Sequence, residues 1–180
     1  MKPGFVFWFT GLSGAGKTAI GKRFYEEFRE RLSNVVFLDG DELREAFGND
    51  LGHSSEDRKK SAMRNSRLCR LLSNQGIHVV IATISLFHEV QNWNRKNIPG
   101  YREIYISVPL EVLSTRDPKG IYARAKKGHA KNVYGIDLGF EAPKTPELIL
   151  NNDGTQSIEI AMKIAVNRFQ KELAVIRGEK

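Results

Sequence analysis

The stretch FVFWFTGLSGAGKT, from Phe5 to Thr18, joins an apolar run to a segment rich in glycine. The unbroken apolar run predicts a strand over Gly4–Thr10 that is buried on both faces of a parallel sheet. The letters GLSGAGKT fit the pattern G-x-x-x-x-G-K-[ST], whose fixed positions are Gly11, Gly16, Lys17 and Thr18. An ordinary glycine turn is the alternative. The position between a strand and a helix favours a loop that binds phosphate.

The residue types in this loop suit a nucleotide triphosphate. Glycines let the backbone curl until several N–H groups point at one phosphate, and the helix that follows presents its positive end. Lys17 would reach the β- and γ-phosphates, and Thr18 would bind Mg²⁺. The residues expected to bind ATP here are Gly11, Ser13, Gly14, Ala15, Gly16, Lys17 and Thr18. The sequence has no guanine-reading N-K-x-D motif, which favours a small-molecule kinase over a GTPase.

Strand and helix signals alternate along the rest of the chain. Short apolar runs predict strands over 35–38, 77–85, 102–108 and 147–153. Helices are predicted from Lys17 to about Leu32, from Ser54 or Ser55 to about Gln75, and after Gly154, with the face of the last marked by Ile158, Ala161, Met162, Ala165 and Phe169. This alternation indicates one α/β domain over 1–180, a three-layer P-loop kinase fold with a central parallel five-stranded sheet. The segment 116–146, rich in Gly, Lys and Pro, is predicted to be a lid.

The composition limits the classes of function. No apolar run approaches the roughly 18–20 residues that a membrane span needs, so we expect a cytoplasmic protein without a membrane partner. The single cysteine, Cys69, excludes an internal disulfide and a cysteine-based metal site. The net charge of +7 suits either a nucleic acid or a ligand with several phosphates. Because no nucleic-acid module is recognised, we predict a small-molecule nucleotide as partner and keep a basic nucleic-acid-binding module as the alternative.

Two acidic residues follow the second predicted strand, in the sequence LDGDELR. Asp39 and Asp41 would lie at the carboxyl end of that strand, the edge at which parallel α/β sheets bind ligands. One carboxylate can help to hold Mg²⁺ while the other accepts a proton from an attacking hydroxyl. The alternative is an Asp-Gly-Asp turn in which Asp41 caps a helix. A position after a strand in a P-loop protein favours the catalytic interpretation.

Eight segments between about Phe5 and Asn151 share the order and spacing of one enzyme family. They are FTGLSGAGKT, FLDGDELR, LGHSSEDR, ISLF, YISVPLEV, RDPKGIYARAKKG, YGIDLGFEAP and PELIL. With them the chain closely resembles the adenylyl-sulfate (APS) kinase family, and RDPKGIY and LDGDELR are its most specific signatures. The resemblance implies transfer of the γ-phosphate of ATP to the ribose 3′-hydroxyl of an activated nucleotide, with Mg²⁺, by a homodimeric enzyme.

The resemblance implies a role for each matching residue. Asp41 is the candidate base beside the acceptor hydroxyl, Asp39 is the metal-side acid, and Lys17 and Lys119 are the other catalytic residues. The residues expected to bind the acceptor are Asp41, Arg44, His53, Arg58, Ser61, Ser85 and Lys119, with Arg116 and Arg124 on the ATP side. The alternative for Arg44 and Arg58 is a solvated helix charge. For Ser85 it is a strand-end serine.

Among the positions that depart from the family pattern, five stand out, and all five are expected on the acceptor side. His53 stands where a phenylalanine is expected to stack on adenine, and Ser61 stands where an asparagine is usual. The others are Met63 for an arginine, Leu86 for a proline and Phe140 for a tyrosine. Adenylyl sulfate leads as the predicted acceptor because it is the commoner family substrate. Cytidine diphosphoramidate, used in capsule biosynthesis, is the alternative because a smaller base fits the same changes.

Overall fold

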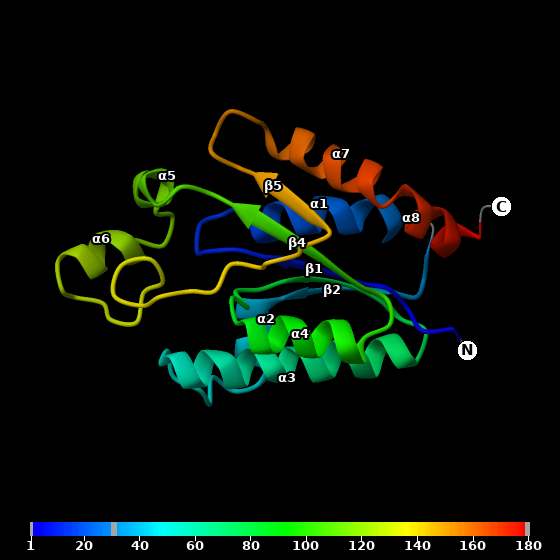
Figure 1. The fold of residues 1–180 in the computed structure, drawn as a ribbon, viewed down its shortest axis with the longest axis horizontal. Coiled ribbons are helices and arrows are strands. Elements are labelled where there is room, and N and C mark those ends of the chain that lie inside the picture. The colour runs from blue at the N-terminus through cyan, green and yellow to red at the C-terminus, as the bar shows by residue number, and fades with distance from the viewer. Residues whose placement is uncertain (1, 30–31, 179–180) are drawn as a thin grey trace.

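A computed structural model describes residues 2–29 and 32–178 of the chain. Its centre is a parallel sheet in the strand order β2-β3-β1-β4-β5 (Figure 1). The strands are β1 (Val6–Thr10), β2 (Val35–Asp39), β3 (His78–Ala82), β4 (Tyr101–Ser107) and β5 (Leu148–Asn151). The predicted α/β fold with a parallel five-stranded sheet is therefore confirmed, and β1 lies in the middle of the sheet.

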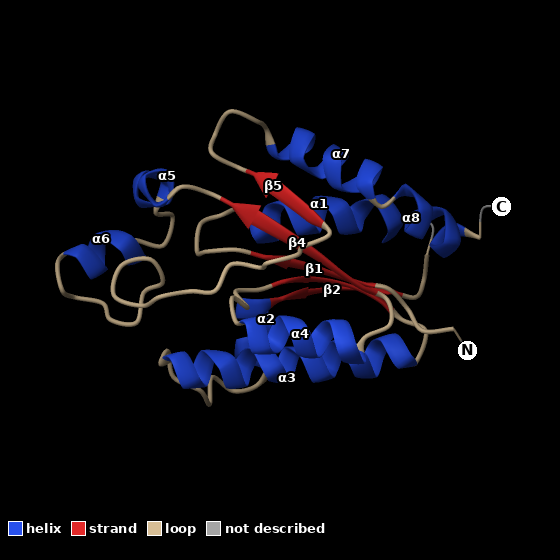
Figure 2. Ribbon diagram, in the orientation of Figure 1, coloured by secondary structure: helices blue, strands red, loops and turns tan. Residues whose placement is uncertain are grey.

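Helices cover both faces of the sheet and complete the three layers (Figure 2). One face carries α1 (Lys17–Arg29), α7 (Ile158–Arg168) and α8 (Gln170–Arg177), and the other carries α2 (Gly40–Ala46), α3 (Ser55–Asn74) and α4 (His88–Asn97). Two short helices, α5 (Leu110–Arg116) and α6 (Ile121–Lys126), lie beyond the end of the sheet. The strand arrows point toward α5 and α6, so the carboxyl edge of the sheet faces them.

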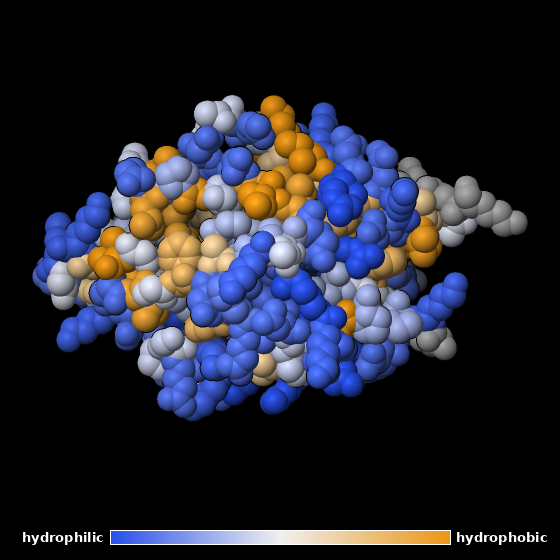
Figure 3. All heavy atoms as spheres, viewed as in Figure 1, coloured by the Kyte–Doolittle hydropathy of each residue, from blue (hydrophilic) through white to orange (hydrophobic). Residues whose placement is uncertain are grey.

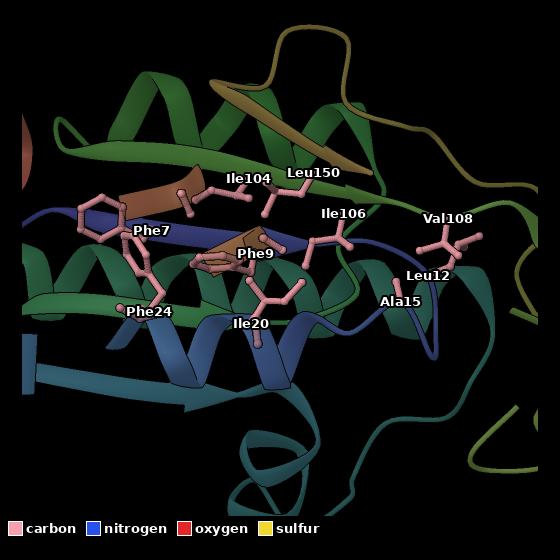
Figure 4. Packing of buried hydrophobic residues seen from close by; sticks show 14 of the residues in the cluster. Phe7, Phe9, Leu12, Ala15, Ile20, Phe24, Ile104, Ile106, Val108 and Leu150 are labelled. Atoms are coloured by element: carbon pink, nitrogen blue, oxygen red, sulfur yellow. The ribbon is translucent and has the colours of Figure 1, made fainter. Parts of the chain in front are cut away.

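The apolar run of β1 is buried on both faces because its side chains enter two separate cores. Phe7 and Phe9 pack against Phe24 of α1, at ring-centroid distances of 5.0 and 5.3 Å (Figure 4). Val6 and Trp8 belong to the second core, with residues of α2 and α3. Alternate side chains of a strand point to opposite faces, so a run without polar residues is what a sheet covered on both sides requires.

Two elements test the predicted boundaries directly. α3 begins after Ser54, whose hydroxyl accepts an N–H bond from Asp57 at 3.1 Å as an N-cap, as the sequence indicates. β3 ends at Ala82, three residues before the predicted end. The helices α2 and α4 were not predicted, because α2 starts directly after β2 without a linker and the sequence of α4 is mostly polar.

The closing helix is divided into α7 and α8. Ala161, Met162 and Ala165 are buried along α7, and Phe169 is buried at the junction, as predicted. Ile158 is 41% exposed, so its expected place on the buried face is wrong. Ile158 is the first residue of α7, before the buried residues Ala161, Met162 and Ala165.

The segment 116–146 contains α6 and a compact turn over residues 132–138, which we call the lid turn. The carboxylate oxygens of Asp137 accept N–H bonds from Asn132 at 2.7 Å and from Val133 at 2.6 Å. The N–H of Gly135 donates to the carbonyl of Leu138 at 2.9 Å. The lid turn is therefore held together by its own hydrogen bonds.

Apolar residues reach the surface in several places on the face drawn in Figure 3, among them the region of β5 and α7. Figure 3 shows hydrophobic atoms over the region of β5 and α7, where Ile149, Ile158, Ile160 and Ile164 are exposed. Within the described residues, no helix combines the length and the apolar character that a membrane crossing would need.

Candidate active site

A cavity of about 410 Å³ lies at the carboxyl edge of the sheet. Its walls come from the phosphate loop (residues 11–18), the start of α2, the loop before α3 together with the first turns of α3, and the lid. The cavity brings together these sequence-predicted site residues: Ser13, Gly14, Gly16, Lys17, Thr18, Asp39, Asp41, Arg44, His53, Arg58, Ser61 and Lys119. The predicted residues outside its lining are Gly11, Ala15, Ser85, Arg116 and Arg124.

The phosphate loop is packed closely from behind. A Cβ on Gly11, whose φ is 155°, would lie 2.5 Å from the carbonyl oxygen of Ile106. A Cβ on Gly16, whose φ is 93°, would lie 2.7 Å from Nδ2 of Asn152. Both positions therefore require glycine on steric grounds. The same Nδ2 group donates a hydrogen bond to the carbonyl of Ala15 at 2.9 Å and so fixes the loop from the side of β5.

Asn152 is a supporting residue that the sequence analysis missed. It follows β5 directly, its side chain is buried, and its backbone N–H donates to the carbonyl of Ser107 at 3.0 Å. The hydrogen bond from Asn152 to Ala15 spans 137 residues, so no local pattern could reveal it. The available signal was a polar residue at the carboxyl end of a predicted strand, the edge where ligands bind.

Lys17 begins α1, and its side chain folds back over the phosphate loop. Its Nζ donates to the carbonyl of Leu12 at 2.8 Å. Burial lowers the pKa of Lys17 from 10.5 to about 8. The negative charges of Asp41 and Asp39 oppose this shift, whereas the positive charge of Lys119 adds to it. Among the described residues, the half-buried Lys17 has no ion-pair partner, so its ammonium favours a ligand that brings negative charge, as a phosphate does.

Asp39 connects the phosphate loop to α2. Its Oδ2 accepts the hydroxyl of Thr18 at 2.6 Å, and its Oδ1 accepts the N–H of Asp41 at 2.8 Å. Asp39 is thus the N-cap of α2 and Asp41 lies in its first turn, so the alternative in which Asp41 caps the helix is wrong. The side chain of Asp41 does not cap the helix and lines the cavity.

The pair formed by Thr18 and Asp39 fits the requirements of Mg²⁺. Mg²⁺ prefers oxygen ligands, and in nucleotide sites it takes few of them from the protein because phosphates and waters complete its shell. A hydroxyl and a carboxylate oxygen, 2.6 Å apart at the phosphate loop, match that ligand set. Residues 2–29 and 32–178 contain no cluster of three or more His, Cys, Asp or Glu that could hold a metal on its own.

Lys119 reaches Asp41 from the loop between α5 and α6. Its Nζ forms an ion pair and hydrogen bond with Oδ2 of Asp41, across 78 residues of sequence. The side chains are 56% and 76% exposed, so the pair contributes little to stability. Two predicted catalytic residues from the lid and from α2 therefore meet at one accessible point of the cavity.

The two predicted acceptor arginines are engaged with backbone carbonyls of residues 50–53, which we call the 50–53 loop. Arg44 donates to the carbonyls of Leu51 and Gly52. Arg58 donates from Nε to the carbonyl of His53 at 2.9 Å. Neither arginine is a solvated helix charge, because both line the cavity and both hold one of its walls.

Only two of the five departures from the family pattern line the cavity, namely His53 and Ser61. Burial lowers the pKa of His53, and the positive charges of Arg44 and Arg58 add to that effect. The imidazole is therefore neutral at pH 7, a state suited to stacking on a base rather than to pairing with an anion.

The other three departures are packing positions. Met63, Leu86 and Phe140 all contact the larger hydrophobic core, and none lines the cavity. The expectation that all five departures lie on the acceptor side is therefore wrong for these three. These three substitutions change the shape of side chains that pack against the core. In a sequence, such a change looks the same as a change in a residue that contacts the ligand.

Three of the five predicted residues outside the cavity lining, Ser85, Arg116 and Arg124, do not belong to the phosphate loop. Ser85 is fully buried, and its N–H donates to the hydroxyl of Thr10 at 3.2 Å. Arg124 donates to the carbonyl of Gly120 at 3.2 Å. Arg116 has Nη2 3.4 Å from the place that a Cβ on Gly154 would take. Their roles with ATP and acceptor stay predictions.

The chain is similar to known proteins of one family. The sequence model of the adenylylsulphate kinase family matches residues 3–151. A cytidine diphosphoramidate kinase of Campylobacter jejuni is 36% identical over 168 residues, which cover 92% of this chain and 96% of that protein. An adenylyl-sulfate kinase of Clostridium acetobutylicum is 42% identical over 146 residues, which cover 81% of this chain and 73% of that protein.

A solved structure has the same overall fold. The APS kinase of Mycobacterium tuberculosis, in complex with AMPPNP and APS, superposes with a TM-score of 0.85 at 32% sequence identity. The match covers 94% of this chain and 99% of that one. The likeness therefore extends over the sheet, both helix layers and the lid.

Proposed function

Because the chain belongs to the adenylylsulphate kinase family, we propose that it transfers the γ-phosphate of ATP to the ribose 3′-hydroxyl of an activated nucleotide. It is a phosphotransferase with a hydroxyl group as acceptor. The observation that carries the proposal is the meeting of Lys17, Asp41 and Lys119 in one cavity between the phosphate loop and the 50–53 loop.

Asp41 is the proposed base. Its carboxylate would take the proton of the 3′-hydroxyl while the ribose oxygen bonds to the γ-phosphorus. The bond from the γ-phosphorus to the oxygen that bridges to the β-phosphate breaks, and ADP leaves. Lys17 and Lys119 place positive charge beside the phosphoryl group during transfer. Thr18 and Asp39 would hold Mg²⁺, which offsets phosphate charge when bound.

The role of Asp41 is tested by Asp41→Asn, with Glu42→Gln as the matched control on the exposed side of the same helical turn. Loss of the base should lower kcat by about 10²- to 10⁴-fold and leave the KM for ATP nearly unchanged. The control should keep the wild-type rate. A near-normal kcat for Asp41→Asn would exclude Asp41 as the base.

Adenylyl sulfate is the acceptor that we propose first. The family description and the 38–42% identical adenylyl-sulfate kinases support it. The position of three departures against the core supports it further, since these residues are outside the cavity lining. Cytidine diphosphoramidate is the second candidate. It is favoured by the relative that aligns over nearly both full lengths and by the presence of His53 and Ser61 in the cavity.

Steady-state ADP release with each acceptor decides between them. We expect a higher kcat/KM with adenylyl sulfate; a clear preference for cytidine diphosphoramidate would reverse the order. The double variant His53→Phe, Ser61→Asn should move the ratio of the two kcat/KM values toward adenylyl sulfate. Phe140→Tyr, a departure outside the cavity, should leave that ratio unchanged. Absence of turnover with both acceptors, together with tight RNA binding, would support the nucleic-acid-binding alternative.

We propose further that residues 11–18 bind ATP, that Arg116 and Arg124 contribute on that side, and that the enzyme is a cytoplasmic homodimer. The resemblance to the family supports these assignments. Light scattering on the purified chain measures the oligomeric state, and a monomeric mass at assay concentration would refute the dimer.

A further inference from the structure

We propose that Arg58 is a positioning residue that joins the lid turn to the 50–53 loop. Its Nε donates to the carbonyl of His53 at 2.9 Å, and its Nη2 donates to the carbonyl of Asn132 at 3.0 Å. Its guanidinium also lies 5.0 Å from the ring centroid of Tyr134. One side chain from the first turn of α3 thus contacts both walls of the cavity at the end away from the phosphate loop.

On the lid side, Arg58 contacts a turn that is held together by its own hydrogen bonds. The lid turn is closed by the two N–H bonds that Asp137 accepts, so a bond to Asn132 holds the whole turn. Tyr134 is 4% exposed and packs edge-on against Phe87, with ring centroids 6.3 Å apart. The tyrosine ring therefore lies between the arginine and the core, which fixes the height of the lid turn above α3.

On the other side, the 50–53 loop is already tied to the body of the protein. Arg44 of α2 bonds to the carbonyls of Leu51 and Gly52, and Arg64 of α3 forms a bidentate pair with Asp50 at 2.9 and 2.8 Å. In the described part of the chain, Arg58 is the side chain whose hydrogen bonds reach both this loop and the lid turn. Arg58 therefore sets the separation of the two walls.

The chemistry of arginine suits this role better than that of lysine. A guanidinium group has five N–H donors in a rigid plane, so two can be bound to carbonyls while the rest stay available to a ligand. A lysine ammonium has the same charge on a single nitrogen and cannot span two carbonyls and a ring. Arg58→Lys therefore separates the bridging role from simple attraction of a negatively charged ligand.

The test is hydrogen exchange on the full chain without nucleotide. In Arg58→Lys, the amides of Asn132, Val133, Gly135 and Leu138 should exchange about tenfold faster or more, because the lid turn loses its anchor. The amides of β1 and β4 in the same sample should be unchanged, which excludes general unfolding. Arg67→Lys, an exposed position on the same helix, is the control and should match the wild type. Unchanged exchange in the lid turn of Arg58→Lys would overturn the proposal.

Kinetics supply the second readout, which rests on the proposed function. Arg58→Lys should raise the KM for the preferred acceptor about tenfold and leave the KM for ATP within about twofold. A loss of folded enzyme would lower kcat and leave both KM values unchanged, and that result would overturn the role in acceptor binding. If the wild type turned over neither acceptor, the proposed function would fail, but the exchange measurement would still decide the role of Arg58.

Discussion

Nucleotide binding should weaken as the pH rises above 8, because Lys17 loses its charge there. Its pKa is lowered to about 8 in the empty protein. For that pKa, the charged fraction of Lys17 is about nine-tenths at pH 7 and about one-tenth at pH 9. If the charged form alone binds the phosphates, the Kd for Mg·AMPPNP rises about tenfold between these pH values. Lys17→Arg binds more weakly overall but shows no such rise, because its guanidinium stays charged.

Isothermal titration calorimetry at pH 7, 8 and 9 measures the Kd for Mg·AMPPNP of the wild type and of Lys17→Arg. The comparison with Lys17→Arg removes any contribution from titration of the ligand itself. Equal affinity of the wild type at pH 7 and pH 9 would refute the depressed pKa.

The lowered pKa of Lys17 also affects the stability of the protein without ligand. Between pH 8 and 10.5 the unfolded chain binds more protons at Lys17 than the folded chain does. The free energy of unfolding therefore gains a contribution that increases with pH in that window.

Three further results are expected. Asn152→Ala leaves the carbonyl of Ala15 without its partner and should raise the KM for ATP at least about fivefold at little change in Tm; an unchanged KM would contradict its support of the phosphate loop. Phe24→Ala removes a fully buried ring in contact with Phe7 and Phe9 and should lower the free energy of unfolding in urea by about 3–5 kcal/mol. A loss below about 1 kcal/mol would refute that packing. Thr18→Val should raise the Mg²⁺ concentration needed for half-maximal rate at fixed ATP, and an unaltered Mg²⁺ titration would exclude Thr18 as a ligand.

The donor half of the site could be predicted because its information is local. The phosphate loop needs glycines, a lysine and a threonine at fixed spacing between one strand and one helix, and all of these are adjacent in the sequence. The start of α3 could also be predicted from the sequence, because its N-cap is a short-range interaction of Ser54 with Asp57. Asp39 and Asp41 were found for the same reason, although which of them caps α2 required the structure.

The acceptor half could not be predicted to the same degree, because its contacts join distant segments. The bond from Arg58 to Asn132 spans 74 residues. A contact of the same kind was missed on the donor side, where the bond from Asn152 to Ala15 spans 137 residues. The sequence analysis identified Arg58 as a cavity residue but assigned it to a ligand only. Met63 was expected on the acceptor side together with His53 and Ser61, since a changed core residue and a changed ligand contact look alike in one sequence.

The position of Asp39 has a consequence for how this enzyme could acquire a new substrate. One carboxylate receives Thr18 from the phosphate loop and the N–H of Asp41 from α2, so the distance between donor and base is set by two hydrogen bonds to a single residue. The residues that would contact the base of the acceptor, His53 and Ser61, belong to a separate segment. If these residues have the proposed roles, substitutions at His53 and Ser61 would change the recognised nucleotide without altering the two hydrogen bonds of Asp39.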